Sequence, residues 1–154
     1  MMVDLNIQDH INYVIANCSQ TFFALHTLKH HGLSSDILKC IFKSTIIPKL
    51  LYAAPSFWGF LPASATNQLQ SVLNKAAKFN YYNKTDPDIR YLVHRMEVDL
   101  FQKVQLHVNC DHILYHLLPE KKNNQYHLRN PMQFKLPCKD DRKYINRMLF
   151  RSIR

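Results

Sequence analysis

Glycine is nearly absent from this chain, with only two among 154 residues. Apolar residues make up 47% of the chain and recur at helical spacing through most of the first 118 positions. Scarce glycine and helical spacing together argue for an all-α body and against a sheet. A chain of this length buries roughly 70% of its unfolded surface, which is enough for one core. We predict an all-α bundle of about four helices, an antiparallel pair plus two more, with an irregular basic C-terminal tail.

Paired cysteines and a long uninterrupted apolar run are also missing. The four cysteines, which form no Cys-x-x-Cys pair, are Cys18, Cys40, Cys110 and Cys138. Their wide spacing favours reduced thiols. The first ten residues lack the basic and apolar regions of a secretory leader. The most apolar stretch, Thr45–Ala63, holds three prolines and Lys49, and a central lysine costs about 2.5–3.5 kcal/mol on insertion scales. We expect a cytoplasmic or nuclear protein that is not secreted and has no membrane partner.

Signatures of catalysis and metal binding are weak. No local Ser-His-Asp or Cys-His pattern is found. The only Asp-Asp pair, Asp140-Asp141, lies in a polar run between basic residues, which predicts a solvated turn. Four residues invite a metal interpretation: His107, Cys110, His112 and His116. On a straight helix Cys110 points away from the face that His112 and His116 share, so we expect core or surface histidines. We predict no metal, no cofactor and no small-molecule substrate.

Two amphipathic helices are predicted at the start of the chain. The first spans Asp9–His31, with its first residue as N-cap and Gly32 just past its end. Ser34 or Ser35 then caps a second helix, which ends or bends near Pro48 because proline has no backbone N–H. The short link makes the two helices an antiparallel pair. The inward residues predicted for the second helix are Ile37, Leu38, Ile41, Phe42 and Thr45.

Two further helices are predicted after the first pair. Pro62 and Ser64 open a third helix, whose apolar face holds Leu69, Val72, Leu73, Ala76 and Phe79. A fourth helix begins with Asp86 as N-cap and Pro87 at its first helical position. It continues to Leu118, either unbroken or with a break near Asn109, and the following proline closes the helical body. Its predicted apolar stripe consists of Ile89, Leu92, Val93, Met96, Leu100 and Val104.

Positive charge is concentrated at the C-terminal end. Residues 1–119 hold ten Lys and Arg against eight Asp and Glu, whereas residues 120–154 hold ten against three. A basic tail favours polyanions through counterion release, which makes nucleic acid the first partner to consider. The tail interleaves its basic residues with Tyr126, Phe134, Tyr144 and Phe150, as in surfaces that follow phosphates and stack on bases. The alternative is that the tail is solvated, or that its apolar residues anchor it to the body through a short helix at 143–150.

Smaller basic and aromatic groups precede the tail. Four residues at the end of the first helix, His26, Lys29, His30 and His31, either complement the helix dipole or form a phosphate-contacting edge. Lys39, Lys43 and Lys49 lie off the apolar stripe of the second helix and could join that edge. Tyr81 and Tyr82, close to Lys84, either stack on bases or close the core.

The most distinctive segment is Ser44–Leu61, STIIPKLLYAAPSFWGFL. Two prolines and a glycine interrupt regular structure around a large aromatic cluster that includes the only tryptophan. We predict a structural corner built by Pro48, Tyr52, Pro55, Trp58 and Gly59. This corner should hold the first three helices together.

The order of these segments resembles the region that follows the polymerase palm in non-LTR (LINE-type, jockey-like) retrotransposon reverse transcriptases. The matching segments are His10-Ile11, Leu25-His26-Thr27-Leu28, Ile46-Ile47-Pro48-Lys49-Leu50-Leu51-Tyr52-Ala53 with Pro55 and Trp58-Gly59, His116-Leu117-Leu118-Pro119, Tyr126-His127-Leu128-Arg129 and Arg147-Met148-Leu149-Phe150. They extend over nearly the whole chain. The resemblance divides the chain into a thumb-like helical pair with its corner (1–60), further helices packed on it (61–119) and a basic, partly extended tail (120–154).

The resemblance implies RNA-directed DNA polymerase ancestry and contact with RNA, an RNA–DNA hybrid or a DNA duplex beside a missing palm domain. The residues that it and the charge pattern nominate for nucleic-acid contact are Lys29, Lys39, Lys43, Lys49, Arg129, Arg142, Lys143, Arg147 and Arg151. Polymerases hold two metal ions with palm carboxylates, and this sequence lacks that motif, so we expect the chain to be inert as a polymerase on its own. The competing hypothesis is a helical interaction or structural module, decayed or domesticated, that touches nucleic acid little.

Overall fold

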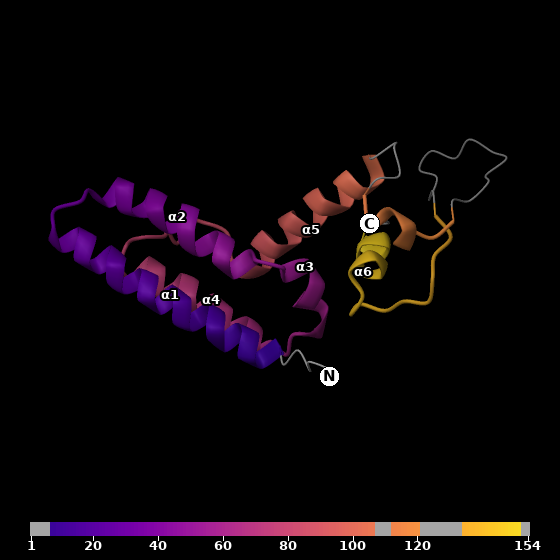
Figure 1. Ribbon diagram of the computed structural model, residues 1–154, viewed down its shortest axis with the longest axis horizontal. Coiled ribbons are helices and arrows are strands. Elements are labelled where there is room, and N and C mark those ends of the chain that lie inside the picture. Colours follow the sequence, from indigo (N-terminus) through magenta and orange to yellow (C-terminus); the bar gives the residue numbers. More distant parts are fainter. Residues whose placement is uncertain (1–6, 107–111, 121–133, 152–154) are drawn as a thin grey trace. The chain divides into compact units, whose positions relative to one another are not determined.

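The computed structural model describes residues 7–106, 112–120 and 134–151, and the fold over these ranges is all-α (Figure 1). Contacts divide the chain into two units, residues 1–93 and residues 94–154. The division falls inside a helix, at neither of the two boundaries that the sequence suggested. No helix in the described ranges is long and apolar enough to cross a membrane.

Unit 1 is built on an antiparallel pair of helices, α1 (Ile7–His30) and α2 (Ser35–Leu51). Gly32 joins them at a φ of 86°, a conformation that costs glycine little. The N–H of Leu33 donates to the Leu28 carbonyl and that of Gly32 to the Lys29 carbonyl, each at 3.1 Å. These two bonds form a Schellman motif and confirm the predicted helix end. Ser34 is the N-cap of α2, as predicted, although its side chain makes no capping bond.

Two expectations for this pair were wrong, those for Asp9 and for Ile37. Asp9 lies inside the first turn of α1, where its charge complements the dipole, and is not the N-cap. Helix α2 ends at Leu51, three residues after Pro48, so it ends near the proline as predicted, and the proline ring is exposed. A proline near a helix end removes one bond, and the burial of Ile46 and Leu50 on either side outweighs that loss. Ile37 is 49% exposed and does not face the core.

The predicted corner consists of a four-residue helix, α3 (Ala54–Phe57), and a 3-10 turn, η1 (Trp58–Phe60). The chain turns at Ala53, which adopts a φ of 55°, and Pro55 follows in the first turn of α3, where proline lacks no needed donor. Pro55 is buried, whereas Tyr52 is 71% exposed. Trp58 is only partly buried and packs on the edge of the unit 1 core. The corner therefore exists, but its tryptophan is not a central core residue.

Helix α4 (Ala63–Lys78) packs against α1 and follows Pro62 as predicted. It ends in a second Schellman motif, with Asn80 at a φ of 64°. The N–H of Tyr81 donates to the Ala76 carbonyl at 2.9 Å, and that of Asn80 donates to the Ala77 carbonyl at 3.1 Å. Asparagine tolerates this left-handed conformation better than most residues. The motif turns Tyr81 back into the core.

The core of unit 1 lies between α1, α2 and α4. Its fully buried large side chains are Ile11, Leu25, Leu38, Phe42, Ile46, Leu69, Leu73 and Ile89. On α1, α2 and α4 these residues repeat at the spacing of one helix face, which is the signal that made the helices predictable.

Helix α5 (Ile89–Leu106) starts two residues later than predicted. The N–H of Tyr91 donates to Asp88 Oδ1 at 2.8 Å, so Asp88 and not Asp86 is the N-cap. Proline therefore lies before the cap and not at the first helical position. The buried stripe of α5 is Ile89, Val93, Glu97, Phe101 and Val104. Met96 and Leu100, which the apolar pattern placed there, are only partly buried.

Unit 2 contains the rest of α5, the 3-10 turn η2 (Tyr115–Leu117) and α6 (Tyr144–Arg151). The described part of α5 reaches Leu106, and residues 112–118 form turns and η2 instead of the predicted helix to Leu118. Helix α6 confirms the short C-terminal helix. A second apolar cluster, formed by Phe101, Phe134, Met148 and Leu149, packs α6 on α5. The tail is therefore anchored by apolar contacts at this point.

Candidate nucleic-acid interface

Five aromatic rings pack together where the C-terminal half of α1 meets α2 and the end of α4. Phe22 is at their centre, with ring centroids 5.9 Å from Phe42 and 6.4 Å from both Phe79 and Tyr81. Phe42 in turn lies 5.6 Å from Tyr82. Four of the rings are buried, whereas Phe79 is 39% exposed. Such tilted pairs contribute about 0.5–1.5 kcal/mol each beyond their buried area and fix the positions of the surrounding side chains.

Lysines surround these rings. The Nζ of Lys75 lies 5.4 Å from the centre of the Phe22 ring, and that of Lys29 lies 5.8 Å from the centre of Tyr81. Lys43 Nζ lies 5.8 Å from the Tyr82 ring, and Lys78 precedes Phe79 in the chain. Each aliphatic stem can cover a ring while the ammonium stays in water. We call the five rings together with Lys29, Lys43, Lys75 and Lys78 the lysine–aromatic cluster.

The charge of the cluster is only partly compensated. Lys43 forms an ion pair with Asp86 at 3.0 Å. Burial alone would raise the pKa of Asp86, but a hydrogen bond from the Asn83 N–H and the charge of Lys43 hold it below its usual value. Lys29 stands in the last turn of α1, and Lys75 and Lys78 in that of α4, where helix dipoles favour cations. All three side chains are exposed. Three lysines from two packed helices therefore meet solvent in one place.

The two tyrosines close the core and do not form a stacking platform. Tyr81 and Tyr82 are 2% and 6% exposed, so neither offers a face to a base. The hydroxyl of Tyr82 donates to the Pro87 carbonyl at 2.7 Å. Burial, aided by the charges of Asp86 and Asp88, raises the pKa of Tyr82 to about 12. The stacking alternative is therefore contradicted for both residues.

Two other lysines nominated on α2 lie apart from these contacts. Lys39 is partly buried, one residue after Leu38 of the core. Lys49 donates from Nζ to Thr21 Oγ1 at 3.0 Å and lines a cavity near the other end of α2. The phosphate-contacting edge predicted along the second helix is therefore not continuous. Lys43 belongs to the lysine–aromatic cluster, whereas Lys49 does not.

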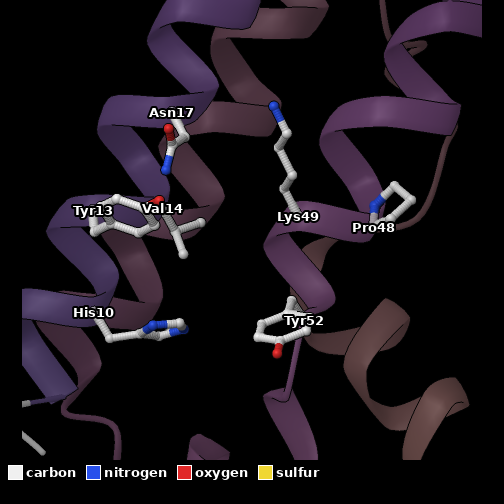
Figure 2. Close-up of a pocket in the computed structure, with 7 residues that line it drawn as sticks. All are labelled: His10, Tyr13, Val14, Asn17, Pro48, Lys49 and Tyr52. Atoms are coloured by element: carbon white, nitrogen blue, oxygen red, sulfur yellow. The ribbon is translucent and has the colours of Figure 1, made fainter.

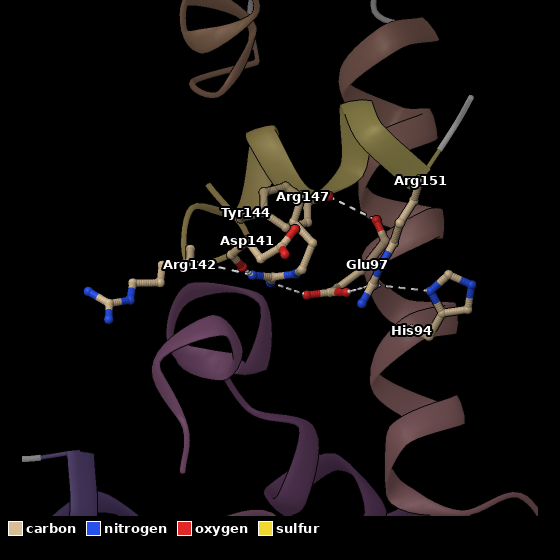
Figure 3. A network of polar contacts seen from close by, with 7 residues as sticks. All are labelled: His94, Glu97, Asp141, Arg142, Tyr144, Arg147 and Arg151. Carbon is tan, nitrogen blue, oxygen red and sulfur yellow. Dashed lines mark hydrogen bonds and ion pairs between the residues drawn. The ribbon is translucent and has the colours of Figure 1, made fainter. Parts of the chain in front are cut away.

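Two arginines of the basic tail form ion pairs with a buried glutamate inside unit 2 (Figure 3). Glu97 is fully buried, and both Arg147 and Arg151 of α6 form ion pairs with its carboxylate, the latter at 2.7 Å. Arg147 is 5% exposed and also donates to the Asp141 carbonyl at 2.7 Å. The hydroxyl of Tyr144 donates to the Glu97 carbonyl at 2.8 Å. The prediction that Arg147 contacts phosphate is wrong, because its guanidinium neutralises a buried carboxylate.

The remaining described tail cations mostly face nearby carboxylates. Lys135 pairs with Glu120 at 2.6 Å, Lys139 with Asp141 at 3.7 Å and Lys143 with Asp140 at 3.8 Å. The Asp140 carboxylate also accepts the Arg142 N–H at 3.1 Å, which confirms a solvated turn at the Asp-Asp pair. The Arg142 side chain points outward in Figure 3. Arg129, which was also nominated for nucleic-acid contact, lies outside the described residues.

The histidine and cysteine group is only partly placed. His107 and Cys110 lie outside the described residues. His112 Nδ1 accepts the Leu114 N–H at 3.2 Å, and His116 lies in η2. Within the described ranges, no three His, Cys, Asp or Glu residues lie close enough together to hold a metal ion.

Sequence reasoning missed Lys75, Lys78 and Glu97. The two lysines carry a local signal, since basic residues one turn apart mark the end of a helix. Their proximity to Lys29 depends on the packing of α4 against α1, which a local pattern does not contain. Glu97 interrupts an apolar stripe, and its two partners are 50 and 54 residues away in the chain.

No protein-family description, no curated protein and no solved structure matches this chain.

Proposed function

We propose that this chain is a non-catalytic helical module that contacts the phosphate backbone of a nucleic-acid duplex through the lysine–aromatic cluster of unit 1. The observation that carries the proposal is the convergence of Lys29, Lys75 and Lys78 on one exposed surface. Each phosphate that a lysine neutralises releases condensed counterions, which favours binding. The buried rings hold the helices that present these cations, so the surface is preorganised before a duplex arrives.

The resemblance to the post-palm region of non-LTR retrotransposon reverse transcriptases supports this proposal. In that context α1 and α2 correspond to a thumb-like pair, and the duplex is an RNA–DNA hybrid or DNA held beside a palm on another segment. The missing palm carboxylates make the chain non-catalytic on its own. The proposed setting is intracellular, cytoplasmic or nuclear.

The ion pairs of the tail favour unit 1 over the tail as the proposed contact surface. Arg147 and Arg151 bind Glu97, and Lys135, Lys139 and Lys143 face carboxylates. A cation that already has an acidic partner gains less from a phosphate, because the pair must first be broken. Lys29 and Lys75 lie over rings, which compete with phosphate far less strongly than a carboxylate does, and Lys78 lies one turn from Lys75 on α4.

Replacing Lys29, Lys75 and Lys78 together by glutamine is expected to weaken binding of a short RNA–DNA duplex at least tenfold, or about 1.4 kcal/mol. Glutamine keeps two of the four methylene groups of the lysine stem and suits a helix well, so the helical content should not change. Fluorescence anisotropy with a labelled duplex at fixed ionic strength measures the change, and circular dichroism checks the fold.

The matched control replaces Lys135, Lys139 and Lys143 of the tail by glutamine, with the same loss of charge. This variant should bind within about twofold of the unmodified chain, since exposed ion pairs contribute little. The assignment of the surface would be refuted if the triple variant of the tail lost more affinity for the duplex than the Lys29, Lys75 and Lys78 variant.

A second candidate function is a helical interaction module with little affinity for nucleic acid. The internal pairing of the tail arginines favours it, because that part of the positive charge has a structural use. Equal and weak binding by the unmodified chain and both triple variants would make this candidate the better one.

A further inference from the structure

A groove runs along the N-terminal half of α1, between this helix and the segment where α2 leads into α3. At one end an apolar cavity of about 500 Å³ is lined chiefly by Ile7, Ala53, Phe57 and Phe60. At the other, a more polar cavity of about 620 Å³ is lined by Tyr13, Asn17, Pro48 and Lys49 among others. His10 and Tyr52 line both cavities, so the two form one continuous groove. We call them the apolar chamber and the polar chamber.

The polar chamber offers hydrogen-bond donors and no negative charge. Figure 2 shows His10, Tyr13 and Asn17 of α1 on one side and Lys49 and Tyr52 on the other. None of the residues that line either chamber in the described part of the chain is acidic. Lys49 Nζ has one donor engaged with Thr21, and an ammonium group carries three. The chamber therefore suits a single negative charge.

His10 is the second polar group that indicates a ligand. Its ring packs edge-on against Phe57, with centroids 5.2 Å apart, at the junction of the chambers. Its Nε2 atom is buried and has no hydrogen-bond partner. Buried polar atoms nearly always have one, because leaving a donor or acceptor unpaired costs about 1–3 kcal/mol. Because this atom has no exposed surface, the His10 ring must turn toward the groove before an oxygen atom of a bound molecule can satisfy it.

We propose that this groove binds an amphipathic carboxylate, a molecule with an acyl or aryl body and one carboxylate group. The body fills the apolar chamber against Phe57 and Phe60, and the carboxylate accepts hydrogen bonds from Lys49 and His10. The volumes are in the range of small-molecule sites. One lysine balances one carboxylate, whereas a phosphate dianion would need more positive charge than the polar chamber supplies.

This site is separate from the lysine–aromatic cluster and does not depend on it. His10 and Lys29 are 19 residues apart on the same helix, which places them about 29 Å apart along its axis. A ligand in the groove therefore does not occupy the surface that we assign to nucleic acid.

The test is a titration of the full chain with decanoate and, separately, with decanol, which shares the apolar body but lacks the charge. Displacement of anilinonaphthalene sulfonate, an aromatic anion that fluoresces in apolar sites, reports binding. Decanoate is expected to bind at least tenfold more tightly than decanol, since a charge-assisted hydrogen bond contributes about 1.5–3 kcal/mol. Lys49→Met should remove this difference by weakening the binding of decanoate.

Three further variants separate binding from folding. Lys39→Met removes a lysine of α2 that does not line the groove and should bind decanoate normally. Ser56→Trp fills the apolar chamber and should abolish binding of both probes. His10→Phe keeps the ring against Phe57, so it should weaken decanoate at least threefold and raise the melting temperature by removing an unpaired buried atom. Equal affinities for decanoate and decanol, or tight decanoate binding that survives Lys49→Met, would overturn the proposal.

Discussion

Replacing Glu97 by glutamine is expected to lower the free energy of unfolding of unit 2 by about 3–5 kcal/mol. Glu97 is fully buried and its carboxylate balances Arg147, which is 5% exposed, and Arg151. Glutamine has nearly the same shape but no charge, so a buried guanidinium loses its counter-ion. Such loss of one partner is far more costly than the net contribution of the intact pair, because the remaining charge stays desolvated.

Urea denaturation followed by circular dichroism measures this effect, and hydrogen exchange of the α6 amides localises it. The matched control is Glu120→Gln, which makes the same chemical change in an exposed pair with Lys135 and should alter stability by no more than about 0.5 kcal/mol. If Glu97→Gln were as mild as this control, the carboxylate would not be holding α6 in place. Replacing Arg147 should likewise lower the stability of unit 2, because Glu97 would then lose a buried partner.

Phe42→Ala is expected to destabilise unit 1 by about 3–5 kcal/mol. Phe42 is fully buried and its ring packs against those of both Phe22 and Tyr82, so truncation leaves a cavity between these two rings in the lysine–aromatic cluster. Trp58→Ala should cost clearly less, because Trp58 is only partly buried at the edge of the core. The sequence had suggested that the Trp58 corner holds the first three helices together.

Thermal and chemical denaturation followed by circular dichroism compares the two variants without relying on tryptophan fluorescence. Phe23→Ala is the control on α1, since Phe23 is 76% exposed and its removal should change stability little. A loss for Trp58→Ala as large as that for Phe42→Ala would restore the corner as the main support of unit 1.

The helices of unit 1 were largely predictable because their signals are local. Apolar spacing marks the faces of α1, α2 and α4, and Gly32 marks a left-handed helix end. The start of α5 was misplaced because both Asp86 and Asp88 suit an N-cap. Tertiary contacts decide between them. Asp86 forms an ion pair with Lys43, which lies 43 residues earlier in the chain, whereas Asp88 accepts the Tyr91 N–H at the start of α5.

The candidate interface was only partly predictable for the same reason. Lys29 and Lys43 were identified from their places on the predicted helices, but Lys75 joins them only through the packing of α4 on α1. The basic tail was a misleading guide to the contact surface, because the net charge of a segment does not show which of its cations are already paired. Arg147 resembles a phosphate ligand in sequence, and its true partner, Glu97, looks like an interruption in an apolar stripe. Pairings across 50 residues are properties of the fold and not of a local pattern.

The salt dependence of duplex binding tests the central claim most directly. Affinity falls with salt on a log–log plot with a slope of about −0.9 for each phosphate contact on duplex DNA, which we take as a guide for the hybrid. For the unmodified chain and the two triple variants, the slope is measured between low and physiological salt with one RNA–DNA duplex. We expect the Lys29, Lys75 and Lys78 variant to lose up to about 2.7 units of slope and the tail variant to keep the slope of the unmodified chain. An unchanged slope for the cluster variant, with a reduced slope for the tail variant, would contradict the account.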